Sequence, residues 1–275
     1  MKKTFIVLCL IVAFALLAFD VQAEEELNVQ LEDQNLHTQK QTNSFYDKYL
    51  KDKLQIGLRE SYQTLTDSDS GAKGGGQGDG TFLGTIYALD EIQSYVPNFY
   101  VNYFFTKYWG VELAYDSIEG ETLATSTGYS TIKSDGDVSL AGPTLSIVGR
   151  YPNQTRFTPY ASIGLGYYFG DFDEEAHWAL GYPDPSVYEA AGSPSTHYYD
   201  KTRVMDVDDP LGFVIAAGCA YRLTDSLSLD LSLSYTNVTA EATFYGYQYG
   251  VLYTEQDGSF PLDNVAVRAG ITFSF

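Results

Sequence analysis

The feature that most constrains this chain is a strict alternation of apolar and polar side chains, which is clearest in two segments near its end. In residues 227–235, leucines at 227, 229, 231 and 233 and Tyr235 are separated by Ser228, Asp230, Ser232 and Ser234. Residues 265–275 repeat the pattern and end on Phe273 and Phe275. Because successive side chains of a strand point to opposite faces, each segment is predicted to be a β-strand with one apolar and one polar face.

The same alternation recurs six more times, in residues 54–62, 99–105, 111–115, 145–151, 161–169 and 213–221. Eight strands are an even number, which is typical of bacterial barrels. We therefore predict an all-β fold, an eight-stranded antiparallel up-and-down transmembrane β-barrel whose apolar face meets lipid. An extra hairpin, giving ten strands, is the main variant.

Short and long connections alternate between these segments. Residues 106–110, 152–156 and 223–226 form short turns, whereas residues 67–95, 119–137, 170–210 and 239–261 are long and polar. Short periplasmic turns and long extracellular loops characterise a transmembrane barrel, and a soluble sandwich rarely carries so many long structureless loops. Aromatic residues near the strand ends are predicted to form girdles at the two membrane interfaces: Tyr108, Trp109, Tyr151, Phe157, Phe169, Tyr221 and Phe275.

The start of the chain has the pattern of an export signal. Two lysines are followed by an apolar run over residues 5–19 and by a small residue at Ala23. That run is shorter than the roughly 20 residues of a membrane-spanning helix, which disfavours an uncleaved anchor. We predict a Sec signal peptide over residues 1–23, a polar periplasmic leader over 24–52 and the barrel over 53–275. The predicted destination is the outer membrane of a Gram-negative cell.

Charge and motifs exclude several functions. With 36 acidic and 16 basic side chains, the chain is a poor nucleic-acid binder, because binding phosphates requires basic surface. Residues 195–197 contain the side chains of a Ser–His pair, but His37, His177 and His197 all lie outside the predicted strands. No metalloprotease, phosphate-loop or dinucleotide motif occurs. We expect no enzymatic activity, no cofactor and no metal site, and we interpret the acidic runs at 171–175 and 206–209 as solvated loops.

Two local features conflict with the simple pattern. Glu60 falls on the apolar face of the first predicted strand, where a carboxylate facing lipid is unfavourable. A β-bulge near residues 57–61 would turn it away. Residues 81–93 are also fairly apolar for a loop, and a short helix or a hairpin extension is expected there.

The polar faces of the strands carry the candidate functional residues. Charges enclosed in a narrow barrel must pair, so opposite signs on several strands predict an internal ion-pair network. Its expected members are Arg59, Glu112, Arg150, Asp230 and Arg268, and Asp116 and Arg222 lie on the same face. The network either fills the lumen structurally or forms a polar constriction that controls passage.

Several segments together resemble the OmpW family of eight-stranded outer-membrane proteins. They are residues 103–114 (YFFTKYWGVELA), 143–146 (PTLS), 159–167 (PYASIGLGY), 220–225 (AYRLTD) and the final Phe275. The resemblance covers residues 53–275, while loop 170–210 and the leader are longer than the family pattern. OmpA-like and OmpX-like small barrels are near alternatives.

This resemblance implies a narrow passive channel or uptake route for small hydrophobic molecules. The alternative is a structural, adhesive or stress-related surface barrel without transport. Expected partners are outer-membrane lipid, lipopolysaccharide and the outer-membrane assembly machinery, which would read Phe273 and Phe275 as a C-terminal signal.

Overall fold

The computed structural model describes residues 49–66, 73–74, 83–89, 94–124, 134–196 and 198–275. The predicted signal peptide and the leader up to residue 48 lie outside this part of the chain. The chain divides into two compact units, Met1–Leu50 and Lys51–Phe275. Only the second is described below. No helix among the described residues is long and apolar enough to cross a membrane.

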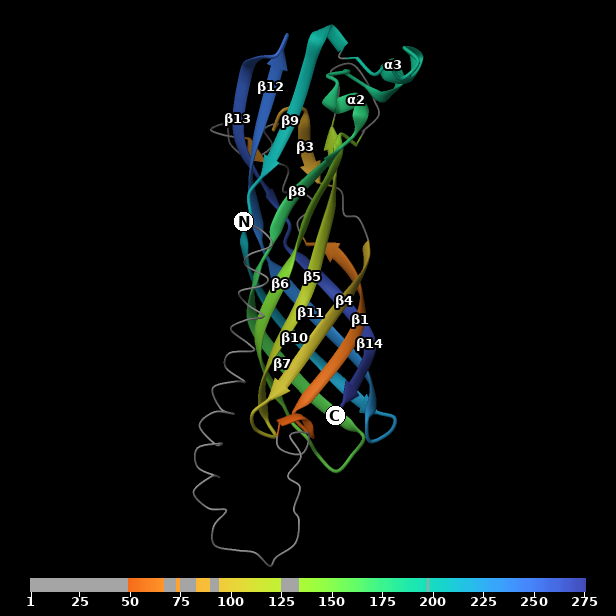
Figure 1. Cartoon of the computed structure of the whole chain (residues 1–275), viewed down its shortest axis with the longest axis vertical. Coiled ribbons are helices and arrows are strands. Elements are labelled where there is room, and N and C mark those ends of the chain that lie inside the picture. The colour runs from red at the N-terminus through yellow and green to blue at the C-terminus, as the bar shows by residue number, and fades with distance from the viewer. Residues whose placement is uncertain (1–48, 67–72, 75–82, 90–93, 125–133, 197) are drawn as a thin grey trace, which may run out of the picture. The chain divides into compact units, whose positions relative to one another are not determined.

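Eight antiparallel strands close into a barrel (Figure 1). Each pairs with its neighbours in sequence, and the last pairs with the first, so the topology is up-and-down. The strands are β1 (Leu54–Leu65), β4 (Ser94–Phe104), β5 (Trp109–Ala124), β6 (Gly136–Arg150), β7 (Phe157–Tyr167), β10 (Leu211–Arg222), β11 (Leu227–Asn237) and β14 (Asn264–Ser274). These are the eight predicted strands, and the predicted fold is confirmed.

The outer face of the barrel is apolar and exposed. Large side chains that a soluble protein would bury point outward here, among them Leu58, Leu145, Ile163, Leu231 and Ile271. Aromatic side chains are exposed near the short turns, including Trp109, Tyr151 and Phe157. An apolar outer band bordered by aromatic residues is what a lipid-facing wall requires.

The long connections are not structureless, which corrects the expectation from the sequence. A second sheet lies at the end of the barrel where these connections gather (Figure 1). It consists of β2 (Lys73–Gly74), β13 (Val251–Pro261), β12 (Thr239–Gln248) and β9 (Lys201–Val207). β8 (Phe169–Glu174) pairs with β6, and the connection from β8 to β9 contains α2 (Ala176–Ala179), α3 (Pro185–Ala190) and a 3-10 turn, η2 (Tyr198–Asp200).

The hydrophobic core of the described residues lies at this same end. It is formed by extensions of the barrel strands together with β8, β9, β12, β13 and α2, and includes Ile118, Leu140, Phe172, Trp178, Phe244 and Phe260. Residues 81–93 contribute in part, because β3 (Ile86–Leu89) pairs with β5. The described part of this segment, for which a short helix or a hairpin extension was expected, is a short strand at the edge of β5.

Glu60 remains on the outer face, so the predicted bulge was wrong. The pairing of β1 with β14 and with β4 runs through Glu60 without a shift in register. Glu60 lies opposite Ala269 on one side and Pro97 on the other. A carboxylate therefore faces outward in the apolar wall, two residues before Tyr62.

Candidate functional site

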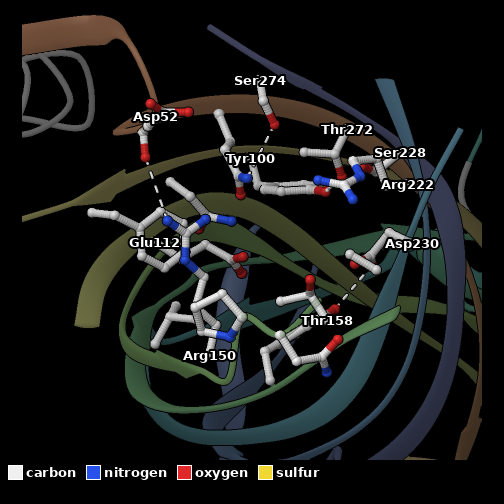
Figure 2. Close-up of a pocket in the computed structure, with 18 of the residues that line it drawn as sticks. Asp52, Tyr100, Glu112, Arg150, Thr158, Arg222, Ser228, Asp230, Thr272 and Ser274 are labelled. Atoms are coloured by element: carbon white, nitrogen blue, oxygen red, sulfur yellow. Dashed lines mark hydrogen bonds between the residues drawn. The ribbon is translucent and has the colours of Figure 1, made fainter. Parts of the chain in front are cut away.

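A polar cavity of about 260 Å³ lies inside the barrel at the end with the short turns. Figure 2 shows side chains from several strands around it, including Glu112 from β5, Asp230 from β11 and Thr272 from β14. Most of the side chains that line it are polar, as the alternation predicts, and the apolar ones on the strands are Phe104, Val148 and Ala220.

An ion-pair layer forms the inner end of this cavity. The Arg59 guanidinium lies 2.8 Å from Glu112 Oε1 and 3.9 Å from Asp230 Oδ1. The Arg59 guanidinium also lies 3.7 Å from the centre of the Tyr100 ring. The Tyr160 hydroxyl donates to Asp230 at 3.0 Å, and the hydroxyls of Tyr100 and Thr272 share a hydrogen bond. Tyr100 and Tyr160 thus belong to this layer, whereas the prediction from the sequence included only its charged residues.

A second layer lies further along the barrel. Arg268 forms a buried ion pair with Asp116, and the Asn98 side chain donates to the other Asp116 oxygen at 3.0 Å. The alternation placed Asp116 on the polar face, but the expected network did not include it. Because the two arginine layers occupy successive levels, the interior here is filled by paired charges.

Arg150 lies outside both layers, which corrects the sequence prediction. Its guanidinium stacks on the Phe104 ring at 3.6 Å from the centroid. It also donates to the carbonyl oxygens of Lys107 at 3.0 Å and Asp52 at 3.4 Å. Arg150 is the last residue of β6, so it reaches the rim of the cavity and not its interior.

The barrel wall has a break between β4 and β5. The two strands pair from Phe104–Gly110 to Phe99–Tyr115. Beyond that point, residues 94–98 of β4 pair with β1, and residues 116–121 of β5 pair with β6. In the described part of the chain, no ladder joins β4 to β5 there. We call this break the seam.

Side chains replace the missing backbone hydrogen bonds at the seam. The Asn98 amide donates to the carbonyl oxygen of Tyr115 at 2.9 Å, and the Gln63 amide donates to that of Ser117 at 3.1 Å. Buried carbonyl groups require such partners in an apolar surrounding. Pro97 lies on β4 beside the seam and has no N–H to donate. A proline within an alternating segment is the sequence signal that could have indicated a broken ladder.

The remaining candidates are placed as follows. His177 is buried on α2, 3.5 Å from Asp135. His37 and His197 lie outside the described residues. No group of three or more potential metal ligands occurs among the residues that the structure describes. At the chain end, Phe273 and Phe275 pack edge to face at 5.1 Å.

A closed antiparallel barrel with a paired polar interior and an apolar exterior defines a class, the transmembrane barrels of the outer membrane. The family description "Outer membrane protein beta-barrel domain" matches residues 6–273, and the chain therefore belongs to this family. It is an outer-membrane protein, as its composition and strand pattern predicted.

Several solved structures are similar to this chain. The crystal structure of the outer membrane protein OprG from Pseudomonas aeruginosa is similar with a TM-score of 0.56 and 17% identity, covering 82% of this chain and 98% of that one. AlkL, solved by solid-state NMR in lipid bilayers, has a TM-score of 0.48, 15% identity and coverages of 88% and 96%. Outer membrane protein W of E. coli has a TM-score of 0.42, 18% identity and coverages of 80% and 97%. A search of curated proteins finds no match.

Proposed function

We propose that this protein is a passive uptake route for small, largely apolar molecules, which leave the barrel sideways through the seam into the outer membrane. The observation that carries the proposal is the combination of a closed interior with a broken wall. Between the cavity and the seam, the interior contains the ion pairs of Arg59 and Arg268. In the described residues, no ladder joins β4 to β5 just beyond Phe99 and Tyr115, whose exposed rings belong to the lipid-facing surface.

The energetics favour a lateral route. An apolar solute that passes two layers of buried ion pairs must separate charges that are stable only when paired. A solute that leaves at the seam meets side-chain hydrogen bonds from Asn98 and Gln63 in place of a backbone ladder. At the end of the barrel with the long connections, an apolar solute would first meet a packed core of aromatic and aliphatic side chains, which would have to open to admit it.

A cross-link across the seam tests the route. Pro97→Cys and Ser117→Cys are combined in a Cys219→Ala background, which removes the free cysteine of the described barrel. Uptake of an apolar solute is then measured in liposomes containing the purified protein. We expect oxidation to reduce uptake to the protein-free rate and reduction to restore it.

The control cross-link joins the same two strands within their ladder. Phe99 and Tyr115 lie directly opposite each other, so Phe99→Cys with Tyr115→Cys forms a disulfide without closing the seam. Oxidation of this pair should leave uptake unchanged. Equal uptake by the oxidised seam pair and the oxidised control pair would refute lateral exit, and no uptake by the native protein would refute transport altogether.

A second candidate function, binding of a surface partner, is favoured by one observation. Tyr199, Tyr249 and Val251 are more than three-fifths exposed at the outer end, where aromatic residues commonly make interfaces. The tip of the β12–β13 hairpin, Tyr249 and Gly250, has two left-handed residues and exposes the Tyr249 and Val251 side chains, whereas Tyr199 lies on η2. Replacing Tyr199 and Tyr249 with serine should abolish cell-surface adhesion without changing the barrel, and unchanged adhesion would exclude this function.

A further inference from the structure

One buried side chain of the hydrophobic core, Trp178, is surrounded in the way that a bound aromatic ligand would be. Trp178 is fully buried, yet it comes from α2, a four-residue helix in the β8–β9 connection, and not from a barrel strand. The first residue before α2, Glu175, makes no side-chain cap. A helix this short has little stability of its own, so its position depends on the contacts of its buried side chains.

The walls around Trp178 are aromatic. Its ring lies 5.3 Å from the Phe172 ring in an edge-to-face arrangement and 5.9 Å from the Phe244 ring in a tilted one. Phe172 is in turn stacked on Phe260. These three rings come from β8, β12 and β13, so the rigid sheets and not the helix supply the walls. We call this surround the indole cage, comprising Phe172, Phe244, Phe260 and Thr85.

Among the described residues, one directed hydrogen bond joins Trp178 to the indole cage. The Trp178 indole N–H donates to Thr85 Oγ1 at 2.8 Å, while the Thr85 hydroxyl donates to the Asp135 carboxylate. Because the Thr85 hydroxyl donates its proton to Asp135, Thr85 Oγ1 acts only as a hydrogen-bond acceptor toward the indole cage. His177 lies 3.5 Å from Asp135 on its other oxygen. Burial lowers the pKa of Arg203, and the charge of Asp135 acts against that shift.

Backbone geometry places Thr85 at this point. Leu83 and Ile86 bridge each other, so Gly84 and Thr85 form the tip of a tight turn. Gly84 has a φ of 61°, and a Cβ there would come within 2.9 Å of the Phe244 ring. The turn therefore approaches the wall of the cage as closely as a residue without a side chain allows.

We propose that the indole cage is a binding site for a planar aromatic molecule with one N–H or O–H donor, of the indole or phenol kind, and that Trp178 occupies it until such a molecule displaces it. The inference rests on the proposed function in one respect, because it names a solute class for that route. Flat aromatic walls select ring shape, and the Thr85 acceptor selects a donor, since an unpaired acceptor in an apolar site is unfavourable. Displacement exchanges one buried ring for another.

The first experiment replaces the occupant. The full-length Trp178→Ala protein, in detergent, is titrated with indole and with 1-methylindole, which has the same ring but no donor. We expect saturable binding at one site, as engineered apolar cavities bind aromatic molecules. Indole should bind roughly tenfold more tightly than 1-methylindole, because one hydrogen bond is lost. Adding Thr85→Val should bring the two affinities within about threefold.

A second measurement keeps Trp178 in place. The chain has two tryptophans, so Trp109→Phe leaves Trp178 as the only one. Adding phenol should shift its emission to longer wavelength and increase its quenching by acrylamide, whereas toluene, which has no donor, should have a smaller effect. This measurement applies even where Trp178→Ala prevents folding.

The outcomes separate the site from the route. Absence of saturable indole binding by folded Trp178→Ala, equal binding of the two indoles, or emission that phenol leaves unchanged would each overturn the site. If indole binds but liposomes that contain the native protein take it up no faster, the binding site is supported and transport is contradicted. Faster uptake of apolar solutes without these binding signals supports the route and rejects the site.

Discussion

The sharpest stability prediction concerns Arg59, the cation of the first ion-pair layer. Its side chain is 2% exposed and lies 2.8 Å from Glu112 and 3.9 Å from Asp230. At an effective dielectric constant of about 20, these attractions amount to about 6 and 4 kcal/mol before desolvation is subtracted. Arg59→Met leaves two buried carboxylates without their cation, and we expect the free energy of unfolding to fall by about 3–5 kcal/mol.

Urea unfolding in lipid vesicles, followed by the gel shift between folded and unfolded barrel, measures this loss. Arg150→Met is the matched control, because Arg150 makes only rim contacts and its removal should lower stability by about 1 kcal/mol or less. Adding Glu112→Gln and Asp230→Asn to Arg59→Met should restore most of the loss, since no uncompensated charge then remains. Equal losses for Arg59→Met and Arg150→Met would show that the layer does not act as a network.

Three further predictions follow from single positions. Glu60→Val should stabilise the barrel by about 1 kcal/mol in the same assay, because it removes a lipid-facing carboxylate. Glu119→Val should change little, because Glu119 is exposed on β5 but lies four residues beyond Tyr115, toward the long connections. Gly84→Ala should destabilise the outer core by about 2 kcal/mol, seen as greater acrylamide quenching of Trp178, whereas Gly250→Ala, which meets nothing within 4 Å, should leave that quenching unchanged. If the assembly machinery reads the C-terminal end of the chain, Phe275→Ala should lower the fraction of folded protein recovered from outer membranes. Leu229→Ala, at an outward position away from that end, is the control, and an equal folded fraction for the two variants would contradict the role of Phe275.

The sequence by itself determined the strands and their faces. Alternation is a local property, because side-chain direction in a strand depends only on position along the backbone. It therefore placed Leu231 outside and Asp230 inside without knowledge of any neighbour. Closure of eight such strands then follows from the need to pair every backbone group in lipid.

Only the tertiary structure decided which inward charges meet. Arg59 pairs across the barrel with Glu112 and Asp230, and Arg268 pairs with Asp116, while Arg150 lies at the rim. All of these residues were on the predicted polar face. Their level along the axis depends on the tilt and register of the strands, which the alternation leaves undetermined. The prediction for Arg150 failed for this reason.

The seam and the indole cage depended on tertiary structure still more. The seam exists because β4 and β5 separate at Phe99 and Tyr115, although both segments continue to alternate beyond that point. The cage joins Thr85, Asp135 and Trp178, which are far apart in sequence and lie in stretches that looked like polar loops. Local pattern specifies which way a side chain points, but contacts between distant segments arise only when the closed barrel brings its connections together at one end.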